Sequence, residues 1–206
     1  SRNEMKSNTG EGRQALQQAR LLGVAGKVDE AIAAYEKLYG GVPDDVDVAI
    51  EYWTLVARLP ARHSEGVSQL KKLNASAPGN VSLLTSLAKQ MFADNKPQEG
   101  FAYLAEMARS ASGRGIAADM WFSEVKSMPV SKASVQALQQ FLLQFPTGSV
   151  AANARVLLDQ QQAQLQDPTF RARSEGLAAV KSGNTTQAVA DLQKAVQADS
   201  RDSDAV

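Results

Sequence analysis

The side chains that could do chemistry are few and scattered along this chain. The sequence has no cysteine and one histidine, His63, which lies between Arg62 and Ser64 at the expected polar start of a helix. A lone imidazole with no nucleophile or second metal ligand beside it does not build a catalytic centre. We interpret His63 as a solvated turn histidine, and we expect no catalytic residue and no enzymatic activity.

Acidic residues offer a second kind of chemistry, because carboxylates bind cations and work in pairs in glycosidases. Asp44, Asp45 and Asp47 follow Pro43 without the glycine and the spaced oxygens of a calcium loop. They read as helix-capping and first-turn carboxylates, and nothing favours a carboxylate pair across a cleft. The short stretch 113–115 (Gly-Arg-Gly) is too short for a phosphate loop. The sequence therefore predicts no metal site and no cofactor.

Aromatic rings could stack on sugars, which makes the two tryptophans candidates for glycan binding. Trp53 and Trp121 each occupy a helix position that normally packs inward, so we expect both to lie in the core. Tyr52 and Phe92 are the better candidates for exposed rings.

Composition narrows the classes of partner. Lys and Arg together number 22, as do Asp and Glu, so the formal net charge of the 206 residues is zero. A neutral chain lacks the electrostatic attraction to nucleic acid or to an anionic membrane. Apolar runs are too short for a membrane span, and the polar start at residues 1–6 does not resemble a signal peptide. Hydrophobic residues make up 44%, enough to bury a core.

A repeat organises the chain. The stretch from Gly26 to Pro43 predicts a turn and an amphipathic helix whose buried face carries Ala31, Tyr35 and Leu38. Residues of the same kinds return 35 positions later at Gly66, Leu70 and Leu73, then at Gly100, Leu104 and Met107, and again after Gly183. Self-similarity at this period is typical of a stacked array of helix pairs.

The array divides the chain into segments that predict an all-α fold. Residues 1–11 form a polar lead-in, and residues 12–146 form four helix pairs. A helix at 149–166, within the segment 147–168, has no partner in that segment, and we expect a hinge there. A further repeat covers 169–200, and residues 201–206 begin the next one.

The spacing of small, aromatic, glycine and proline positions resembles the tetratricopeptide repeat family. That resemblance implies a right-handed superhelix, an α-solenoid, with first helices lining a concave groove. The family's groove-facing positions, among them Leu55, Ser82 and Thr85, supply our candidate binding residues, which are Arg13, Arg20, Glu51, Arg58, Lys89, Phe92, Asp119, Lys126 and Arg173.

Longer stretches resemble the periplasmic repeat region of the bacterial cellulose export subunits, over about 12–205. They include Glu51-Tyr52-Trp53, Pro60-Ala61-Arg62, Ala77-Pro78-Gly79-Asn80 and Phe170-Arg171-Ala172-Arg173. Members of that family have a signal peptide and a C-terminal outer-membrane barrel, neither of which occurs in this chain.

The resemblance implies a periplasmic, non-catalytic scaffold of cellulose biosynthesis and polysaccharide export. Its expected partners are other subunits of the cellulose synthase complex, with the cellulose chain or peptidoglycan as further ligands, and guidance of the glucan to the outer-membrane pore as a second role. The alternative is a general peptide-binding adaptor that does not contact the glucan.

Overall fold

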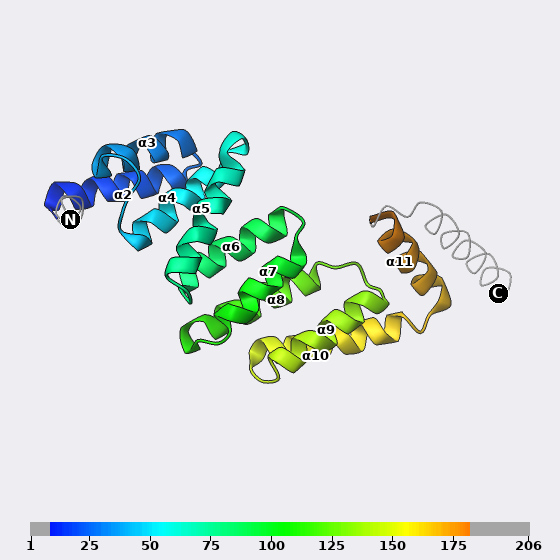
Figure 1. Cartoon of the computed structure of the whole chain (residues 1–206). Helices are drawn as coiled ribbons and strands as arrows, with labels where there is room; N and C mark the ends of the chain where they lie inside the picture. The colour runs from blue at the N-terminus through cyan, green and yellow to red at the C-terminus, as the bar shows by residue number, and fades with distance from the viewer. Residues whose placement is uncertain (1–8, 182–206) are drawn as a thin grey trace. The chain divides into compact units, whose positions relative to one another are not determined.

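The structure, a computed structural model, describes residues 9–181 and shows helices joined by short turns (Figure 1). No strand occurs in this range, so the all-α prediction is confirmed. The helices are α2 (Gly10–Val24), α3 (Val28–Tyr39), α4 (Val46–Arg58), the 3-10 helix η1 (Pro60–Arg62), α5 (His63–Ser76), α6 (Val81–Ala93), α7 (Pro97–Met107), α8 (Ala111–Lys126), α9 (Lys132–Gln144), α10 (Ser149–Gln164) and α11 (Pro168–Lys181).

The chain divides into two compact units between Ala117 and Ala118, within α8. In the first unit, residues 1–117, successive helices pack as the pairs α2–α3, α4–α5 and α6–α7. Each pair is joined by a turn too short for any return except an antiparallel one. The tetratricopeptide-like helix pairs predicted from the repeat are therefore present in this unit.

The start of each first helix is set by a side-chain cap. Thr9, Asp45 and Asn80 accept hydrogen bonds from backbone N–H groups in the first turns of α2, α4 and α6, at 3.0, 3.1 and 3.0 Å. These bonds satisfy donors that have no partner within the helix. The capping role predicted for the acidic cluster is confirmed at Asp45, and the cap at Thr9 starts α2 inside the predicted lead-in.

Small residues let the two helices of a pair cross closely. A Cβ atom added to Gly66 of α5 would lie 2.5 Å from the backbone nitrogen of Ala57 in α4. One added to Gly100 of α7 would lie 2.7 Å from the ring of Phe92 in α6. Ala31 is fully buried at the equivalent place in α3. The small positions of the repeat are thus sites of close approach.

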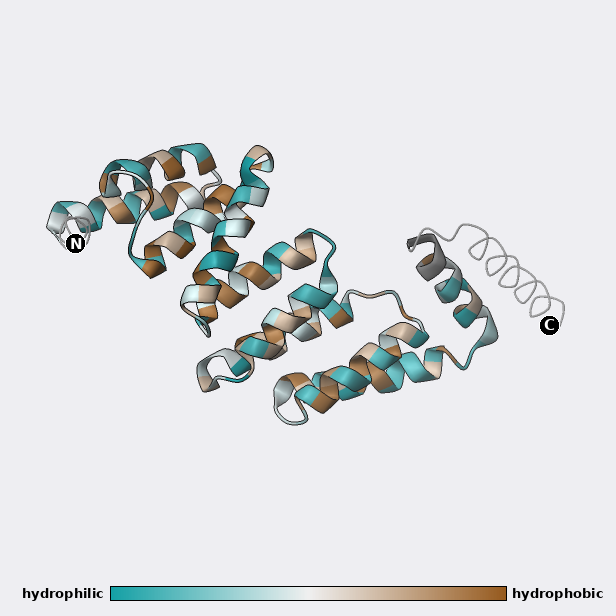
Figure 2. Ribbon diagram, in the orientation of Figure 1, coloured by the Kyte–Doolittle hydropathy of each residue, from teal (hydrophilic) through white to brown (hydrophobic). Residues whose placement is uncertain are grey.

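Bulky residues at the next repeat positions form the core. Tyr35, Leu70 and Leu104 are almost completely buried, and the first unit's main cluster also holds Val56, Leu83 and Leu87. Hydrophobic residues recur along each helix and alternate with polar ones (Figure 2). Burying one such side chain stabilises the fold by about 1.5–3 kcal/mol.

In the second unit, residues 118–206, α10 occupies the segment expected to hold an unpaired helix. It packs against α9, and the buried side chains of Ser134 and Gln161 are hydrogen-bonded at 2.6 Å. The expectation of a helix without a partner needs this correction, because the neighbouring segment supplies one. The hinge at 147–168 stays a prediction, and the parts of the last repeats at 182–206 lie outside the described residues.

The close crossing at Gly66 gives a test of the fold. We expect Gly66→Ala to lower the free energy of unfolding by about 2 kcal/mol, because the added methyl group meets backbone that cannot move aside. Gly115→Ala is the matched control: its Cβ would meet nothing within 4 Å, and alanine should favour the helix by up to about 1 kcal/mol. Urea unfolding followed by circular dichroism measures both, and equal effects of the two changes would contradict the close crossing.

Candidate functional site

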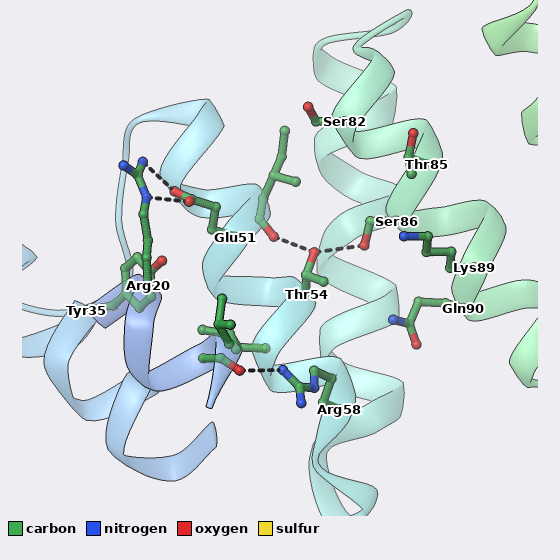
Figure 3. Close-up of a pocket in the computed structure, with 14 residues that line it drawn as sticks. Arg20, Tyr35, Glu51, Thr54, Arg58, Ser82, Thr85, Ser86, Lys89 and Gln90 are labelled. Carbon is green, nitrogen blue, oxygen red and sulfur yellow. Dashed lines mark hydrogen bonds and ion pairs between the residues drawn. The ribbon is translucent and has the colours of Figure 1, made fainter. Parts of the chain in front are cut away.

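A groove of about 560 Å³ runs along the first helices of the first unit (Figure 3). We call it the first-helix groove. Its walls come from α2, α4 and α6, with Tyr35 of α3 reaching in from below the α2 helix. The lining residues are Arg20, Gly23, Val24, Tyr35, Ile50, Glu51, Thr54, Leu55, Arg58, Ser82, Thr85, Ser86, Lys89 and Gln90.

Helical spacing brings these side chains to one side. In α4, Glu51, Thr54 and Arg58 are three, four and seven residues apart, which places them on one stripe of the helix. Ser82, Thr85 and Lys89 repeat this spacing in α6. The remaining faces of both helices are buried in the core, so this stripe is the one that remains accessible.

A bidentate ion pair joins α2 to α4 at one wall of the groove. Nε and Nη2 of Arg20 donate to the two carboxylate oxygens of Glu51 at 2.7 and 3.1 Å. The hydrogen bond to Glu51 raises the pKa of Arg20. Beneath the pair, burial and the Glu51 charge raise the pKa of Tyr35 to about 12, so its phenol stays neutral. Because both charged side chains are partly exposed, the pair positions the groove wall more than it stabilises the fold.

Two further hydrogen bonds connect neighbouring helix pairs inside the groove. Nη1 of Arg58 donates to the backbone oxygen of Gly23 at 3.0 Å, which links α4 to α2. Thr54 donates its only proton to the carbonyl of Ile50 at 2.6 Å, so the hydroxyl of Ser86, 2.8 Å away, donates to Thr54 and links α6 to α4. These links hold the groove in shape before any ligand arrives.

The groove carries positive charge and apolar surface together. Arg20 and Glu51 neutralise each other, whereas Arg58 and Lys89 form no ion pair with any carboxylate of residues 9–181. Val24, 87% exposed, adds accessible apolar surface. Such a lining can hold aliphatic groups and anionic groups side by side.

The structure brings together four of the predicted binding residues, Arg20, Glu51, Arg58 and Lys89. Arg13 is an exposed residue of α2 that does not line the groove. Asp119, Lys126 and Arg173 are exposed residues of the second unit.

Phe92 was expected to face the groove, and the structure does not place it there. Its ring lies over Gly100 and contacts Phe101 of α7, with ring centroids 5.0 Å apart. It therefore fills the gap that the glycine leaves between the helices of its own pair. Thr54, Ser86 and Val24 were missed, although the i, i+3 spacing from Glu51 to Thr54 was available in the sequence.

The aromatic predictions have a mixed outcome. Trp53 is 7% exposed and packs edge-on against Tyr52, as expected of a core residue. Trp121 is half-buried and packs against Phe145 in the second unit. Tyr52 was expected to be exposed but is 2% exposed, because its hydroxyl reaches Glu36 of α3 in a 2.7 Å hydrogen bond. Among the residues whose side chains the structure describes, no tryptophan lines the first-helix groove.

His63 was interpreted as a solvated turn residue, and this is wrong. Its Nδ1 lies 2.6 Å from the carbonyl oxygen of Ala57, and its Nε2 lies 2.7 Å from Oδ2 of Asp94. Both partners are acceptors, so only the doubly protonated ring can donate to both. The hydrogen bond to Asp94, followed by the one to Ala57, accordingly raises the pKa of His63.

This geometry predicts how stability changes with pH. Because the pKa of His63 in the folded chain is above its usual 6.5, its contribution to stability is fully present below pH 6.5. That contribution is lost as pH rises through the raised pKa. We expect the difference in unfolding free energy between wild type and His63→Gln to be larger at about pH 5.5 than at about pH 8.5. Urea unfolding at both pH values measures it, and His63 is the only histidine. A difference independent of pH would show that the ring does not titrate in this way.

Membrane-spanning helices and metal-binding clusters are both absent from residues 9–181. No helix in this range has the length and apolar character needed to cross a membrane. In the same range, no three His, Cys, Asp or Glu side chains gather in a way that could hold a metal ion.

Comparisons with known proteins identify relatives of the chain, although no family model matches it. Over 206 residues it is 50% identical to cellulose synthase operon protein C of Salmonella typhimurium and 49% identical to the protein of that name from Escherichia coli K12. Each match covers all of this chain and 18% of the relative's length.

A solved structure agrees. It is the crystal structure of the flexible tandem repeat domain of a bacterial cellulose synthase subunit, which is 50% identical, with a TM-score of 0.66 over 80% of this chain and 68% of that chain. The chain therefore belongs to the family of cellulose synthase operon protein C and is similar to the solved tandem repeat domain.

Proposed function

We propose that this chain is a non-catalytic, periplasmic scaffold of bacterial cellulose biosynthesis, and that its first-helix groove binds an extended segment of another subunit of the cellulose synthase complex. The helical repeat fold and the relatives support a scaffold related to cellulose synthesis. Export of the polysaccharide is the process in which we place it. The groove lining is the observation that supports a protein ligand.

A glucan guide would present exposed aromatic rings along its path, because the apolar face of a sugar ring packs on them. The first-helix groove offers hydroxyl, amide and charged groups, and its single aromatic residue, Tyr35, is 1% exposed. Guidance of the cellulose chain and contact with peptidoglycan therefore receive less support from this groove than a protein segment does.

An extended peptide fits the lining better. Its backbone can exchange hydrogen bonds with Thr54, Ser82 and Thr85, while its aliphatic side chains cover Val24 and Leu55. Arg58 and Lys89 favour a segment with acidic side chains, since neither forms an ion pair within the described residues. The links between helices keep the groove formed in advance, which lowers the entropic cost of binding.

A photo-crosslinker in the groove tests the proposal. In cells that make cellulose, the full-length protein would carry benzoylphenylalanine at Ser82, an exposed groove residue, or at Lys37, an exposed residue of α3 outside the groove. We expect a covalent adduct with another protein of the cellulose synthase complex from position 82 and none from position 37, identified by mass spectrometry.

Charge variants add a quantitative prediction. Arg58→Gln with Lys89→Gln should reduce the yield of the adduct by about tenfold or more, because two contacts to acidic side chains are lost. Lys37→Gln with Lys132→Gln makes the same change in net charge at exposed positions outside the groove and should leave the yield unchanged. Circular dichroism would check that both double variants remain folded.

A glucan titration separates the alternative function. Saturable amide shifts at the groove with cellohexaose, together with no protein adduct from position 82, would replace the proposal with glucan guidance. An adduct from position 82 without a cellohexaose response is the expected result.

A further inference from the structure

A second groove of about 550 Å³ lies in the first unit, between α5 and the turn from α6 to α7. We call it the α5 groove. It involves the second helix of a pair, whereas the first-helix groove is lined mainly by first helices. Its lining residues are His63, Ser64, Val67, Ser68, Lys71, Lys72, Ala75, Asp94 and Lys96.

Four cationic groups and one carboxylate line this groove. Lys71 pairs with Glu99 of α7 at 3.3 Å, and His63 pairs with Asp94. Lys72 and Lys96 form no ion pair with a carboxylate of residues 9–181. Both are exposed and come from opposite walls, so the groove holds uncompensated positive charge from two sides.

The neutral donors point to the kind of anion. Ser64 and Ser68 are exposed hydroxyls one helical turn apart on α5, and Lys72 follows one turn later. Lysine binds as a compact point charge with three donors, which suits the distributed oxygens of phosphate or sulfate, while carboxylates pair best with the planar fork of arginine. No arginine lines this groove.

We propose that the α5 groove binds a tetrahedral oxyanion, a phosphate or sulfate group of a small ligand or of a lipid headgroup. Lys72 and Lys96 hold the anion from the two walls, and Ser64 and Ser68 donate hydrogen bonds to its oxygens. The groove is of the size that small-molecule sites have.

His63 makes this site sensitive to pH. The charged groups that face the ring are Asp94 and Lys96 of the α6–α7 turn, and the neighbouring Arg62 and Glu65 neutralise each other in a 2.8 Å ion pair. While the ring is protonated, it cancels the charge of Asp94. As pH rises through the raised pKa of His63, Asp94 becomes an uncompensated negative charge in the groove. Oxyanion affinity therefore falls with rising pH.

The experiment has one arm for each source of the anion. In the first, the 206-residue chain is titrated with inorganic sulfate and followed by amide NMR shifts. In the second, its binding to vesicles of equal parts phosphatidylcholine and phosphatidylglycerol is compared with binding to pure phosphatidylcholine. Lys72→Gln with Lys96→Gln is the test variant. Lys37→Gln with Lys132→Gln, at exposed positions outside the groove, is the control with equal net charge.

We expect saturable binding in at least one arm, with shifts at α5 and at the α6–α7 turn. The test variant should weaken it by about tenfold or more, and the control should not. Binding in the sulfate arm alone assigns a small ligand, and binding to the anionic vesicles assigns a lipid headgroup. No saturable binding in either arm, or equal weakening by both variants, would overturn the proposal.

A pH series tests the role of His63 separately. Sulfate keeps its charge across the range, so a change in affinity between about pH 6 and pH 9 reports on the protein. We expect wild-type affinity to fall over this range and His63→Gln to show a flat profile. A wild-type profile as flat as that of the variant would remove His63 from the site.

Discussion

The approach of Gly66 to the backbone of Ala57 sets the distance between the helices of a pair. At this separation the bulky residues one turn away, such as Leu70, close the core completely. The second helix thereby covers one side of the first and leaves a single stripe accessible. The groove residues of α4 and α6 lie on that stripe, so the closeness of the crossing decides which side chains are available for binding.

Contacts between successive pairs are fewer and more polar than contacts within a pair. Arg20 with Glu51, Arg58 with the carbonyl of Gly23, and Thr54 with Ser86 join neighbouring first helices on the side of the groove. His63 with Asp94 joins the start of α5 to the end of α6. In a repeat array each unit contacts only its neighbours. Within the first unit, the same side chains therefore line the grooves and connect the pairs.

Features that repeat with the period of the array could be predicted from the sequence. The small positions at Ala31, Gly66 and Gly100 follow from their spacing, and the groove residues Arg58 and Lys89 follow from helical periodicity. Phe92 failed because one residue corresponds to a rotation of about 100° around a helix, enough to move a ring from the groove to the neighbouring helix.

Features that depend on a distant partner were not predictable in this way. The environment of His63 depends on Asp94, 31 residues away, and no local pattern signals that contact. The packing of α10 depends on a buried hydrogen bond between Ser134 and Gln161 of neighbouring helices, which a search for apolar periodicity passes over. Polar contacts of this kind are specific to one pair of atoms, whereas the apolar pattern repeats.

The acceptor of Arg58 is the main-chain oxygen of Gly23, not a side chain. Every residue type offers that oxygen, so mutational drift in α2 cannot delete the acceptor. Size is the remaining restriction at position 23, since a Cβ would come within 3.2 Å of the flexible end of Leu55. Over evolutionary time the burden of preserving this junction thus falls unevenly. α2 can change its chemistry with little consequence for the link, while α4 must keep one arginine.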